Sequence, residues 1–537
     1  MPNLIGIETF GKDMTAGRGA PIFEVDTTSS GTSITYHPAT GSANEYYSGS
    51  FRSALALNAP RNIVFKVSGT IAAVYDDYFL LDYPYCSIWG QSAPGEGIII
   101  TGGALYLRAG EVFMQHIRHS GLTPTDGLPA NKTQNNVYVT NLPGYPYDKT
   151  IMDHCSLMWS NDDAFALTGD ISLGGFSNNL IGETIVSGPP PGEYVSGCGM
   201  VTGYGTRPRT MYGSWYRNFM GSSQKRSPLV GNGYYYDIVN NVMTNTGTKM
   251  NFQCVYDSCE WNVVNNYAKD PPGVPGETTN PCGSIYCHTP FMPSSLMYRA
   301  GNYNPAFPAY TQLQLIPEDP YSPATFYGPP SYSGTRLSWG LTYPGELSAI
   351  DAAASVTDVN TGAGARLATD ANGDFVRIND VFRARMLTNW VNNTMPNFDV
   401  DPQDPGEGGY TRPVPALGAQ PYTDTNHDGV PDSFLLPTGK RGNHIHTTGP
   451  GTDLSYLEIY MASADHPEYV DWFGGTAPVI THSSPYLVTA GIEKAIAVSL
   501  SDVDSDVVSV QLTSTGLTVI RFDKATVEAQ GVTVTAL

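Results

Sequence analysis

Lys225 and Arg226 stand side by side in the stretch GSSQKRSPLV, just before Pro228. Adjacent cations are unusual in this chain, because it contains 49 Asp and Glu residues against 28 Lys and Arg residues. Two such side chains can bind an anionic group of a ligand, or stabilise negative charge that develops during a reaction. The alternative is a solvated turn in which Pro228 ends a strand.

A second group of candidate residues lies in the stretch DTNHDGVPDSF. Asp424, Asn426, Asp428 and Asp432 follow the D-x-N-x-D-G-x-x-D pattern of a calcium loop, and Gly429 allows the sharp turn that such a loop needs. The bidentate Glu that closes an EF-hand is missing. We expect calcium here, and the alternative is an acidic surface loop without metal.

The composition excludes several classes of partner. A net charge of −21 disfavours nucleic acid and anionic membrane surfaces, because both require clustered Lys and Arg. No apolar run approaches the length of a membrane span, and the first residues lack the basic start and apolar stretch of a signal peptide. We therefore expect no nucleic-acid partner, no membrane span and no N-terminal export signal.

Short β-branched runs alternate with Gly, Asn, Asp and Pro breaks between residues 60 and 265, as in NIVFKVSGTI, GIIITGG and NNVYVTNL. Each unit is too small to bury its apolar face alone, so the units must stack. The Asn pairs at 178/179, 240/241 and 265/266 fit turns at equivalent places in successive coils, because Asn tolerates the left-handed conformation and its amide can bond a like neighbour one coil away. This pattern predicts a parallel β-solenoid.

The later part of the chain changes character. Residues 310 to 350 are rich in Pro, Tyr and Ser and predict an extended segment wrapped on the surface. The runs ELSAIDAAASV and INDVFRARMLTNWVNN predict amphipathic helices packed against the solenoid, and the last residues alternate as in a small β-sandwich. We expect three domains, at residues 1–310, 311–476 and 477–537.

Four runs of sequence resemble the pectate lyase superfamily (polysaccharide lyase family one and its distant relatives), over about residues 5 to 465. They are ETFGKDMTAGRGAPIFEV, SFRSALALNAPRNIVFKVSGTI, SIWGQSAPGEGIIITGGALYLR and IMDHCSLMWSNDDAFALTG. The resemblance implies an all-β fold: a right-handed parallel β-helix, here with a surface-packed extension of helices and loops and a small C-terminal β-sandwich. That last segment is similar to cadherin-like or Ig-like repeats of surface proteins.

The resemblance also assigns site residues. RSPLV followed by an Asn-Asn turn is similar to the family's Arg-x-Pro-x-Val run, which gives Arg226 the place of the catalytic arginine, as base by resemblance and as electrostatic stabiliser by physics. Gly231 replaces the next family arginine, so Lys225, Arg207 or Arg209 would have to supply the charge that contacts a substrate carboxylate.

The metal ligands that the family implies are only partly present. Asp162 and Asp163 match the first calcium carboxylates, with a turn-forming Asn-Asp-Asp as the alternative. The second acidic pair has no clean equivalent, since Glu183 and Glu193 do not keep the spacing. Two other residues of the family motifs, 153 and 154 (an Asp-His pair), are expected to form a hydrogen-bonded structural pair.

The leading function is therefore a polysaccharide lyase that cleaves a uronate-containing acidic glycan by β-elimination, with calcium as cofactor. The alternatives are a glycan-binding protein that keeps the fold without turnover, and a structural virion or surface protein such as a tail spike or appendage subunit. We expect an extracellular protein, secreted or virion-associated, with an acidic polysaccharide as partner and a homotrimer or a virion or surface assembly as a further possibility.

Overall fold

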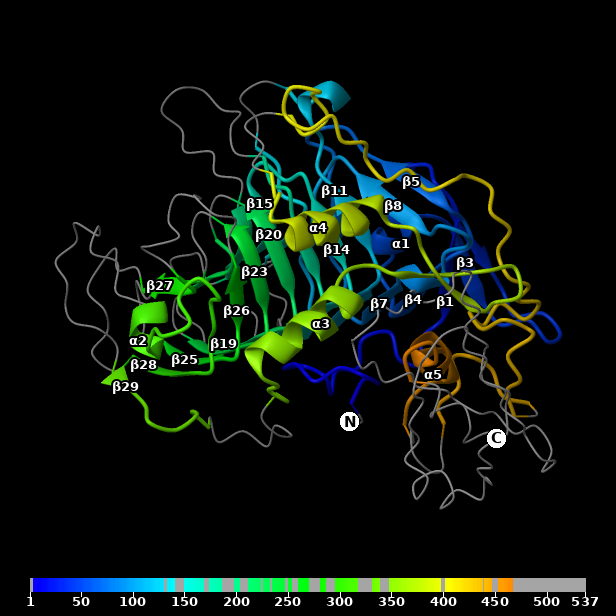
Figure 1. Cartoon of the computed structure of the whole chain (residues 1–537). Helices are drawn as coiled ribbons and strands as arrows, with labels where there is room; N and C mark the ends of the chain where they lie inside the picture. Colours follow the sequence, from blue (N-terminus) through cyan, green and yellow to red (C-terminus); the bar gives the residue numbers. More distant parts are fainter. Residues whose placement is uncertain are drawn as a thin grey trace, which may run out of the picture.

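The computed structural model describes residues 3–129, 133–140, 149–168, 173–185, 198–202, 211–223, 226–231, 234–246, 250–253, 259–269, 281–285, 295–316, 331–338, 347–396, 401–437, 439–446 and 453–466. Strands dominate these residues, and nearly all of them belong to three sheets of parallel strands that run side by side along the molecule (Figure 1).

The first sheet has 13 strands, in the order β2 (Ile34–His37), β3 (Tyr46–Ser50), β1 (Ile22–Thr27), β4 (Arg61–Phe65), β7 (Cys86–Trp89), β10 (Val112–Gln115), β13 (Lys149–Asp153), β16 (Leu173–Ser177), β19 (Met211–Tyr216), β22 (Tyr234–Val239), β25 (Glu260–Val264), β28 (Leu296–Ala300) and β29 (Ser331–Tyr332). The second sheet contains β5 (Gly69–Ala72), β8 (Ile98–Thr101), β11 (Arg118–Ser120), β14 (Ser156–Met158), β17 (Leu180–Gly182), β20 (Phe219–Ser223), β23 (Val242–Thr246) and β26 (Tyr267–Lys269). The third sheet contains β6 (Phe79–Leu81), β9 (Leu105–Leu107), β12 (Val137–Val139), β15 (Asp163–Leu167), β18 (Cys198–Thr202), β21 (Leu229–Gly231), β24 (Met250–Gln253) and β27 (Gly283–Ile285).

Successive strands of the chain visit the three sheets in turn, so that β4, β5 and β6 form one coil and β7, β8 and β9 form the next. Each strand pairs in parallel with its equivalent one coil away, as β4 does with β7 and β6 with β9. The protein is therefore an all-β parallel β-helix, as the repeat spacing predicted. In the run NIVFKVSGTI, Ile63, Val64 and Phe65 lie in β4, whereas Val67 follows its end.

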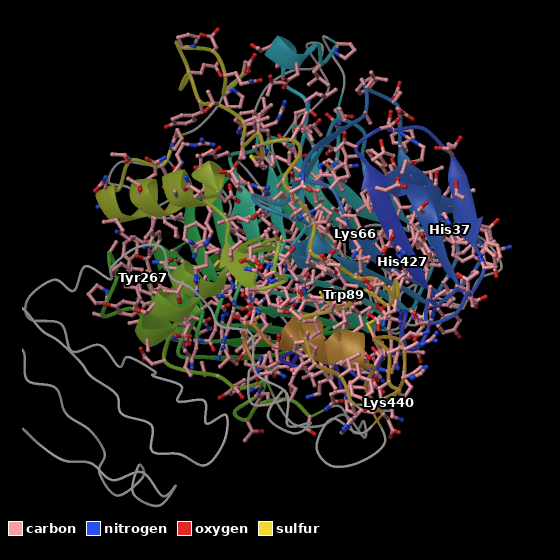
Figure 2. The ribbon with its side chains drawn as sticks, turned by 90° about the vertical axis from the view of Figure 1, so that its right-hand side faces the viewer. His37, Lys66, Trp89, Tyr267, His427 and Lys440 are labelled. Carbon is pink, nitrogen blue, oxygen red and sulfur yellow. The ribbon has the colours of Figure 1, made fainter. Side chains whose placement is uncertain are left out.

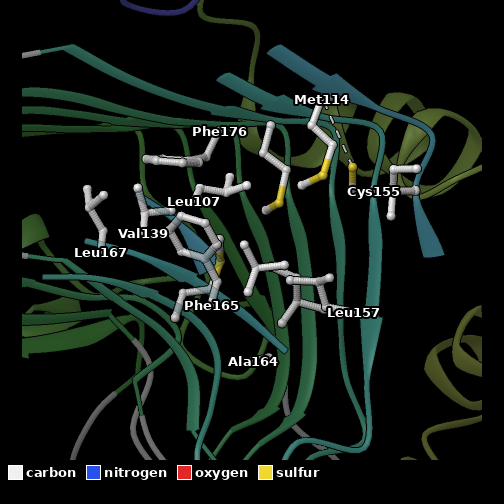
Figure 3. Close-up of a cluster of buried hydrophobic side chains, with 14 of the residues drawn as sticks. Leu107, Met114, Val139, Cys155, Leu157, Ala164, Phe165, Leu167 and Phe176 are labelled. Atoms are coloured by element: carbon white, nitrogen blue, oxygen red, sulfur yellow. Dashed lines mark hydrogen bonds between the residues drawn. The ribbon is translucent and has the colours of Figure 1, made fainter. Parts of the chain in front are cut away.

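The core of the β-helix is apolar because alternate residues of each strand point inward. Leu107, Val139, Leu167 and Phe165 come from neighbouring strands of the third sheet and pack against Phe176 of the first sheet (Figure 3). All five side chains are fully buried or nearly so. No coil could bury these residues without its neighbours, which is the physical reason that the repeat stacks.

A ladder of buried asparagines marks the turn between the first and second sheets. Their amides hydrogen-bond from coil to coil at 2.9–3.0 Å, and the residue before each of the five is left-handed, with φ between 52° and 65°. The ladder consists of Asn179, Asn218, Asn241, Asn266 and Asn302. The turn chemistry predicted from the Asn pairs is thus confirmed, with the first Asn of each pair in the left-handed turn and the second in the ladder.

Helices cover the outer face of the second sheet. The helices are α3 (Ala352–Gly362) and α4 (Val381–Asn392), in the region where amphipathic helices were expected, and Figure 1 shows both lying across that sheet. Phe382, Met386 and Trp390 of α4 pack on Phe219 and Val242. The apolar spacing in the sequence is explained by this packing.

The outer face of the first sheet is covered by the N-terminal segment and by α5 (Tyr456–Ala462). Leu457 and Tyr460 of α5 join Val64, Trp89 and Phe113 in one buried cluster. The remaining described elements are short: α1 (Phe51–Ala56), η1 (Gly90–Ser92), η2 (Pro124–Asp126), α2 (Gln312–Leu315) and the antiparallel pair β30 (Leu367–Thr369) and β31 (Phe375–Arg377). No described helix is long and apolar enough to cross a membrane.

The domain boundaries at 310/311 and 476/477 stay predictions. Much of the segment 310 to 350 and the whole segment 477–537, where a β-sandwich was expected, lie outside the described residues.

Candidate active site

Arg226 lies at the corner of the β-helix that leads into β21 of the third sheet. Its Nη1 donates to both carboxylate oxygens of Asp163, at 2.9 Å each. Asp163 begins β15, which is two coils away, because β18 lies between β15 and β21. Stacking of the coils therefore brings together two residues that are 63 positions apart in the sequence.

The intervening coil permits this approach because it carries Gly199 at the crossing point. A Cβ at this position would lie 2.8 Å from the Arg226 carbonyl oxygen and 3.2 Å from Oγ of Ser227. Arg226 itself has a left-handed φ of 59°, and its carbonyl accepts a hydrogen bond from the amide of Met200 at 2.5 Å. A left-handed non-glycine residue costs free energy and persists only where its surroundings hold it. The hydrogen bond from Met200 and the ion pair with Asp163 supply that support.

The two aspartates beside Arg226 differ in environment. Asp163 is nearly buried, with 9% of its side chain exposed, and its backbone amide donates to Oδ1 of Asn135 at 2.9 Å. Asp162 is half-buried, and burial raises the pKa of its carboxyl, while the nearby Arg226 charge acts in the opposite direction. The site thus holds one carboxylate bound by the arginine and a second one within its electrostatic reach.

Lys225, Arg207 and Arg209 lie outside the described residues, so their predicted roles remain predictions. Glu193 is outside them too. Glu183 is described and is fully buried, with its oxygens accepting from Nε and Nη2 of Arg385 at 2.7 and 2.5 Å and from the indole of Trp159 at 3.0 Å. This residue anchors α4 to the β-helix, and sequence reasoning missed the role because the partner is 202 residues away.

Calcium does not fit the described part of this site as a complete metal centre. Calcium in proteins takes about six to eight oxygen ligands. Asp162 and Asp163 supply two carboxylates, and Arg226 already binds one of them. No cluster of three or more His, Cys, Asp or Glu side chains that could hold a metal was found within the described ranges.

The loop at 424–432 has the donor chemistry expected for calcium. Asp424 accepts hydrogen bonds from the amides of Asp428 and Gly429 at 3.0 and 2.9 Å, and Gly429 has a left-handed φ of 82°. Oδ1 of Asn426 is buried and has no hydrogen-bond partner. Burial, followed by the Asp424 charge, raises the pKa of Asp428 to about 6. An orphaned oxygen and two crowded carboxylates are what a cation would satisfy.

The tertiary structure adds a cation that the sequence pattern did not reveal. Nζ of Lys66, on the coil after β4, lies 3.1 Å from Asp424 and 3.7 Å from Glu24. His427 also reaches Glu24, with Nδ1 at 3.0 Å, and its ring stacks on Tyr46 at 3.9 Å (Lys66 and His427 are labelled in Figure 2). The loop is therefore fastened to the first coils of the β-helix, far from Arg226 in the sequence, and any calcium bound there would be structural.

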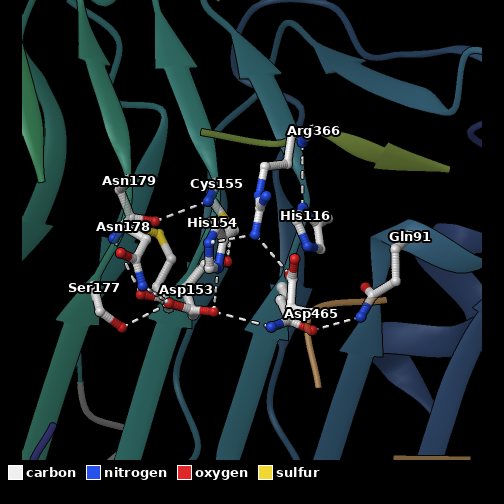
Figure 4. Close-up of polar contacts among 12 residues, drawn as sticks. Gln91, His116, Asp153, His154, Cys155, Ser177, Asn178, Asn179, Arg366 and Asp465 are labelled. Carbon is white, nitrogen blue, oxygen red and sulfur yellow. Dashed lines mark hydrogen bonds and ion pairs between the residues drawn. The ribbon is translucent and has the colours of Figure 1, made fainter. Parts of the chain in front are cut away.

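Residues 153 and 154 form the structural pair that was expected (Figure 4). Nδ1 of His154 lies 2.6 Å from Oδ2 of Asp153, and Ser177 and Asn178 donate to Oδ1 at 2.7 and 3.0 Å. Burial by itself would raise the pKa of the Asp153 carboxyl, but His154 and these donors hold the pKa well below its usual range. The buried carboxylate joins β13 to β16.

The chain is similar in sequence to fungal proteins that bear the name pectate lyase. Protein-family models gave no match. A protein from Aspergillus fumigatus, called probable pectate lyase C, is 24% identical over 476 residues, which cover 85% of this chain and 92% of that protein. Its namesake from Aspergillus terreus is 28% identical over 246 residues, which cover 45% of this chain and 48% of that protein. The resemblance to the pectate lyase superfamily is confirmed.

Two solved structures are also similar. The cedar pollen allergen jun a 1 aligns at 12% identity and a TM-score of 0.42, covering 66% of this chain and 91% of its own. A thermostable pectate lyase, PL 47, aligns at 12% identity and a TM-score of 0.42, covering 68% of this chain and 98% of its own. The strand pairing of this pectate lyase-like chain by itself defines the β-helix.

Proposed function

We propose that this pectate lyase-like protein is a polysaccharide lyase that cleaves a uronate-containing acidic glycan by β-elimination. The observation that carries the proposal is the position of Arg226, held against Asp163 and within electrostatic reach of Asp162 on the outer edge of the third sheet. The fungal relatives that bear the name pectate lyase support it.

The reaction needs a fixed positive charge. A base removes the proton on the carbon next to the sugar carboxylate, the electron pair forms a C=C bond, and the bond to the leaving glycosidic oxygen breaks. That oxygen takes up a proton from water and becomes a hydroxyl group. Negative charge builds on the carboxylate as the proton leaves, and a preorganised cation at that position stabilises it. A guanidinium stays protonated at neutral pH. Its planar fork also suits a carboxylate. Arg226 is therefore assigned to stabilising the developing charge.

The ion pair with Asp163 positions this cation. Nη1 donates to Asp163, which leaves the remaining guanidinium nitrogens in a fixed orientation relative to the β-helix. Positioning of a charge before the reaction avoids reorganisation during it. Lys225, Arg207 and Arg209 are proposed as further cations for the substrate carboxylates. Calcium is proposed as a structural ion of the 424–432 loop, with Asp424, Asn426, Asp428 and Asp432 as its ligands. A catalytic calcium beside Arg226 would require oxygen ligands in addition to Asp162 and Asp163.

One observation favours a second candidate function. Because Arg226 occupies Asp163 and the described residues do not complete a metal centre beside it, a protein that binds acidic glycan without turnover would have the same described site. A virion or surface component, including a trimeric tail spike, is the form that this second function would take. In either case we place the protein outside the cell or on a surface.

Incubation with a panel of uronate-containing polysaccharides separates the two functions. Elimination leaves an unsaturated sugar that absorbs ultraviolet light, so a lyase gives rising absorbance, and parallel reactions with calcium and with a chelator test the cofactor. Binding of a polysaccharide without any rise in absorbance would refute turnover and leave the binding function.

A further inference from the structure

The corner between the first and second sheets carries a left-handed residue in successive coils. His116 and His154 occupy this position in two adjacent coils, with φ of 55° and 50°, and Asn178, Asn240 and Asn265 occupy it in later coils, with φ between 52° and 55°. Both residue types are enriched in the left-handed region. They differ in one respect, because only histidine takes up a proton within the range of ordinary pH.

Asn240 shows how a corner residue fastens the segment that covers the β-helix. Its Oδ1 accepts a hydrogen bond from the backbone amide of Ile350 at 3.0 Å, and its Nδ2 donates to the carbonyl of the same residue at 2.6 Å. Ile350 lies just before α3. A side-chain amide does not titrate, so this contact does not depend on the pH.

His116 makes the equivalent contact with an imidazole. The backbone amide of Arg366 donates to its Nδ1 at 3.2 Å. A nitrogen that accepts a hydrogen bond carries no proton, so the buried His116 ring is neutral. The amides of the two residues before Arg366 donate to the Asn178 carbonyl at 2.7 Å and to Oγ of Ser156 at 2.9 Å. We call residues 363–366 the corner strap.

The guanidinium of Arg366 faces the second histidine (Figure 4). Its Nη2 donates to Asp465 at 2.6 Å and lies 3.5 Å from Nε2 of His154. Nδ1 of His154 is already 2.6 Å from Asp153, so a proton taken up by the neutral ring goes to Nε2, on the side of the guanidinium. The rings of His116 and His154 are stacked, with their centroids 5.0 Å apart. A positive charge on either ring would therefore face Arg366.

The surroundings of the His116 ring oppose a further positive charge. The charged and titratable groups that act on it come from the next coil and from the covering segment: His154, Asp153, Arg366 and Arg377. Burial opposes protonation most strongly, and only Asp153 favours it, so the pKa of His116 lies well below its ordinary value. The unfolded chain therefore binds this proton at a higher pH than the folded protein does. The stability that the neutral ring provides is present above about pH 6.5 and is lost as the pH falls.

From these contacts we infer that the corner strap is an acid-sensitive latch: uptake of protons by the two corner histidines releases Arg366 from the β-helix, whereas the asparagine contact at Ile350 holds. Arg366 leads directly into β30, and its ion pair with Asp465 ties down the chain that follows α5. Both elements contribute to the apolar cluster on the outer face of the first sheet. Release of the latch loosens them and leaves the start of α3 in place. The inference does not depend on the proposed lyase chemistry.

Hydrogen–deuterium exchange of the full chain tests the latch, with labelling at about pH 7.5 and about pH 4 and with times scaled to the intrinsic exchange rate. Protection of the Arg366 amide should fall about tenfold or more at the lower pH, because its acceptor becomes a positively charged donor. Protection of the Ile350 amide should stay within about twofold, since Asn240 does not titrate. The comparison of these two amides within the parent protein requires no variant.

His116→Asn is the matched variant. It places at this corner the residue type that already occupies the equivalent position at Asn240, and its Oδ1 can accept the Arg366 amide without titrating. Protection of the Arg366 amide should then be retained at both pH values. Unchanged protection of Arg366 in the parent protein at about pH 4 would overturn the inference. An equal loss at Ile350, or a loss in His116→Asn as large as in the parent, would overturn it as well.

Discussion

Replacement of Arg226 is the sharpest test of the candidate active site. Arg226→Ala removes the cation that faces the developing charge, and the loss of one preorganised donor from such a site typically lowers turnover by about a hundredfold or more. Arg226→Lys should recover little of this activity, because a single ammonium cannot reproduce the planar fork that Asp163 holds in place. Initial rates of absorbance increase on a uronate polymer measure both variants.

The ion pair also sets a stability cost. Asp163 exposes 9% of its side chain and Arg226 exposes 23%, so Arg226→Ala removes a charged donor from a nearly buried carboxylate. Loss of a partner from such a group costs about 1–3 kcal/mol of unfolding free energy. Denaturant unfolding should show this loss, and the activity should be measured well below the unfolding midpoint so that the two effects are separated.

A matched control is available on the first sheet. Nη2 of Arg336 lies 3.2 Å from Asp237, with 12% and 7% of the two side chains exposed. Arg336→Ala should therefore destabilise the protein by a similar amount and leave turnover of the remaining folded protein unchanged. If Arg226→Ala cleaves as fast as the parent protein, or if Arg336→Ala slows turnover as strongly, the assignment of Arg226 fails.

Three further perturbations test other parts of the structure. Calcium should raise the melting temperature by binding the folded 424–432 loop, and Asp428→Asn should abolish the difference; curves that coincide with calcium and with chelator would contradict a calcium site. Asn241→Ala should lower the free energy of unfolding by about 3 kcal/mol or more, because it leaves Asn218 and the other buried partners of Asn241 unsatisfied. Denaturant unfolding measures this loss, and a loss below about 1 kcal/mol would argue against a cooperative ladder. Burial lowers the pKa of His119 from 6.5 to about 4, so the unfolded state binds a proton at a higher pH than the folded state does. The free energy of unfolding should therefore fall by about 3 kcal/mol as the pH drops from about 6.5 to 4, and His119→Leu should flatten that slope. An identical slope in the variant would refute this role of the buried His119.

The β-helix could be predicted from the sequence because its signals are local. β-branched runs at a regular spacing can be read without knowing which coils touch, and the Asn pairs gave both the left-handed turn and the amide ladder. The two amphipathic helices followed from apolar spacing in the same way, since α3 and α4 each bury one face. In all these elements the residues that decide the structure lie within a few positions of one another.

The partners within the candidate site were decided by tertiary structure. Arg226 binds Asp163 directly although the two residues lie two coils apart, because the glycine in the intervening coil allows a close approach. The calcium-loop pattern predicted ligands at 424–432, but nothing in it indicated Lys66, 358 positions earlier. The spacing of a motif determines which ligands its own residues can bind. The stacking of the coils determines which distant charged residue lies beside them.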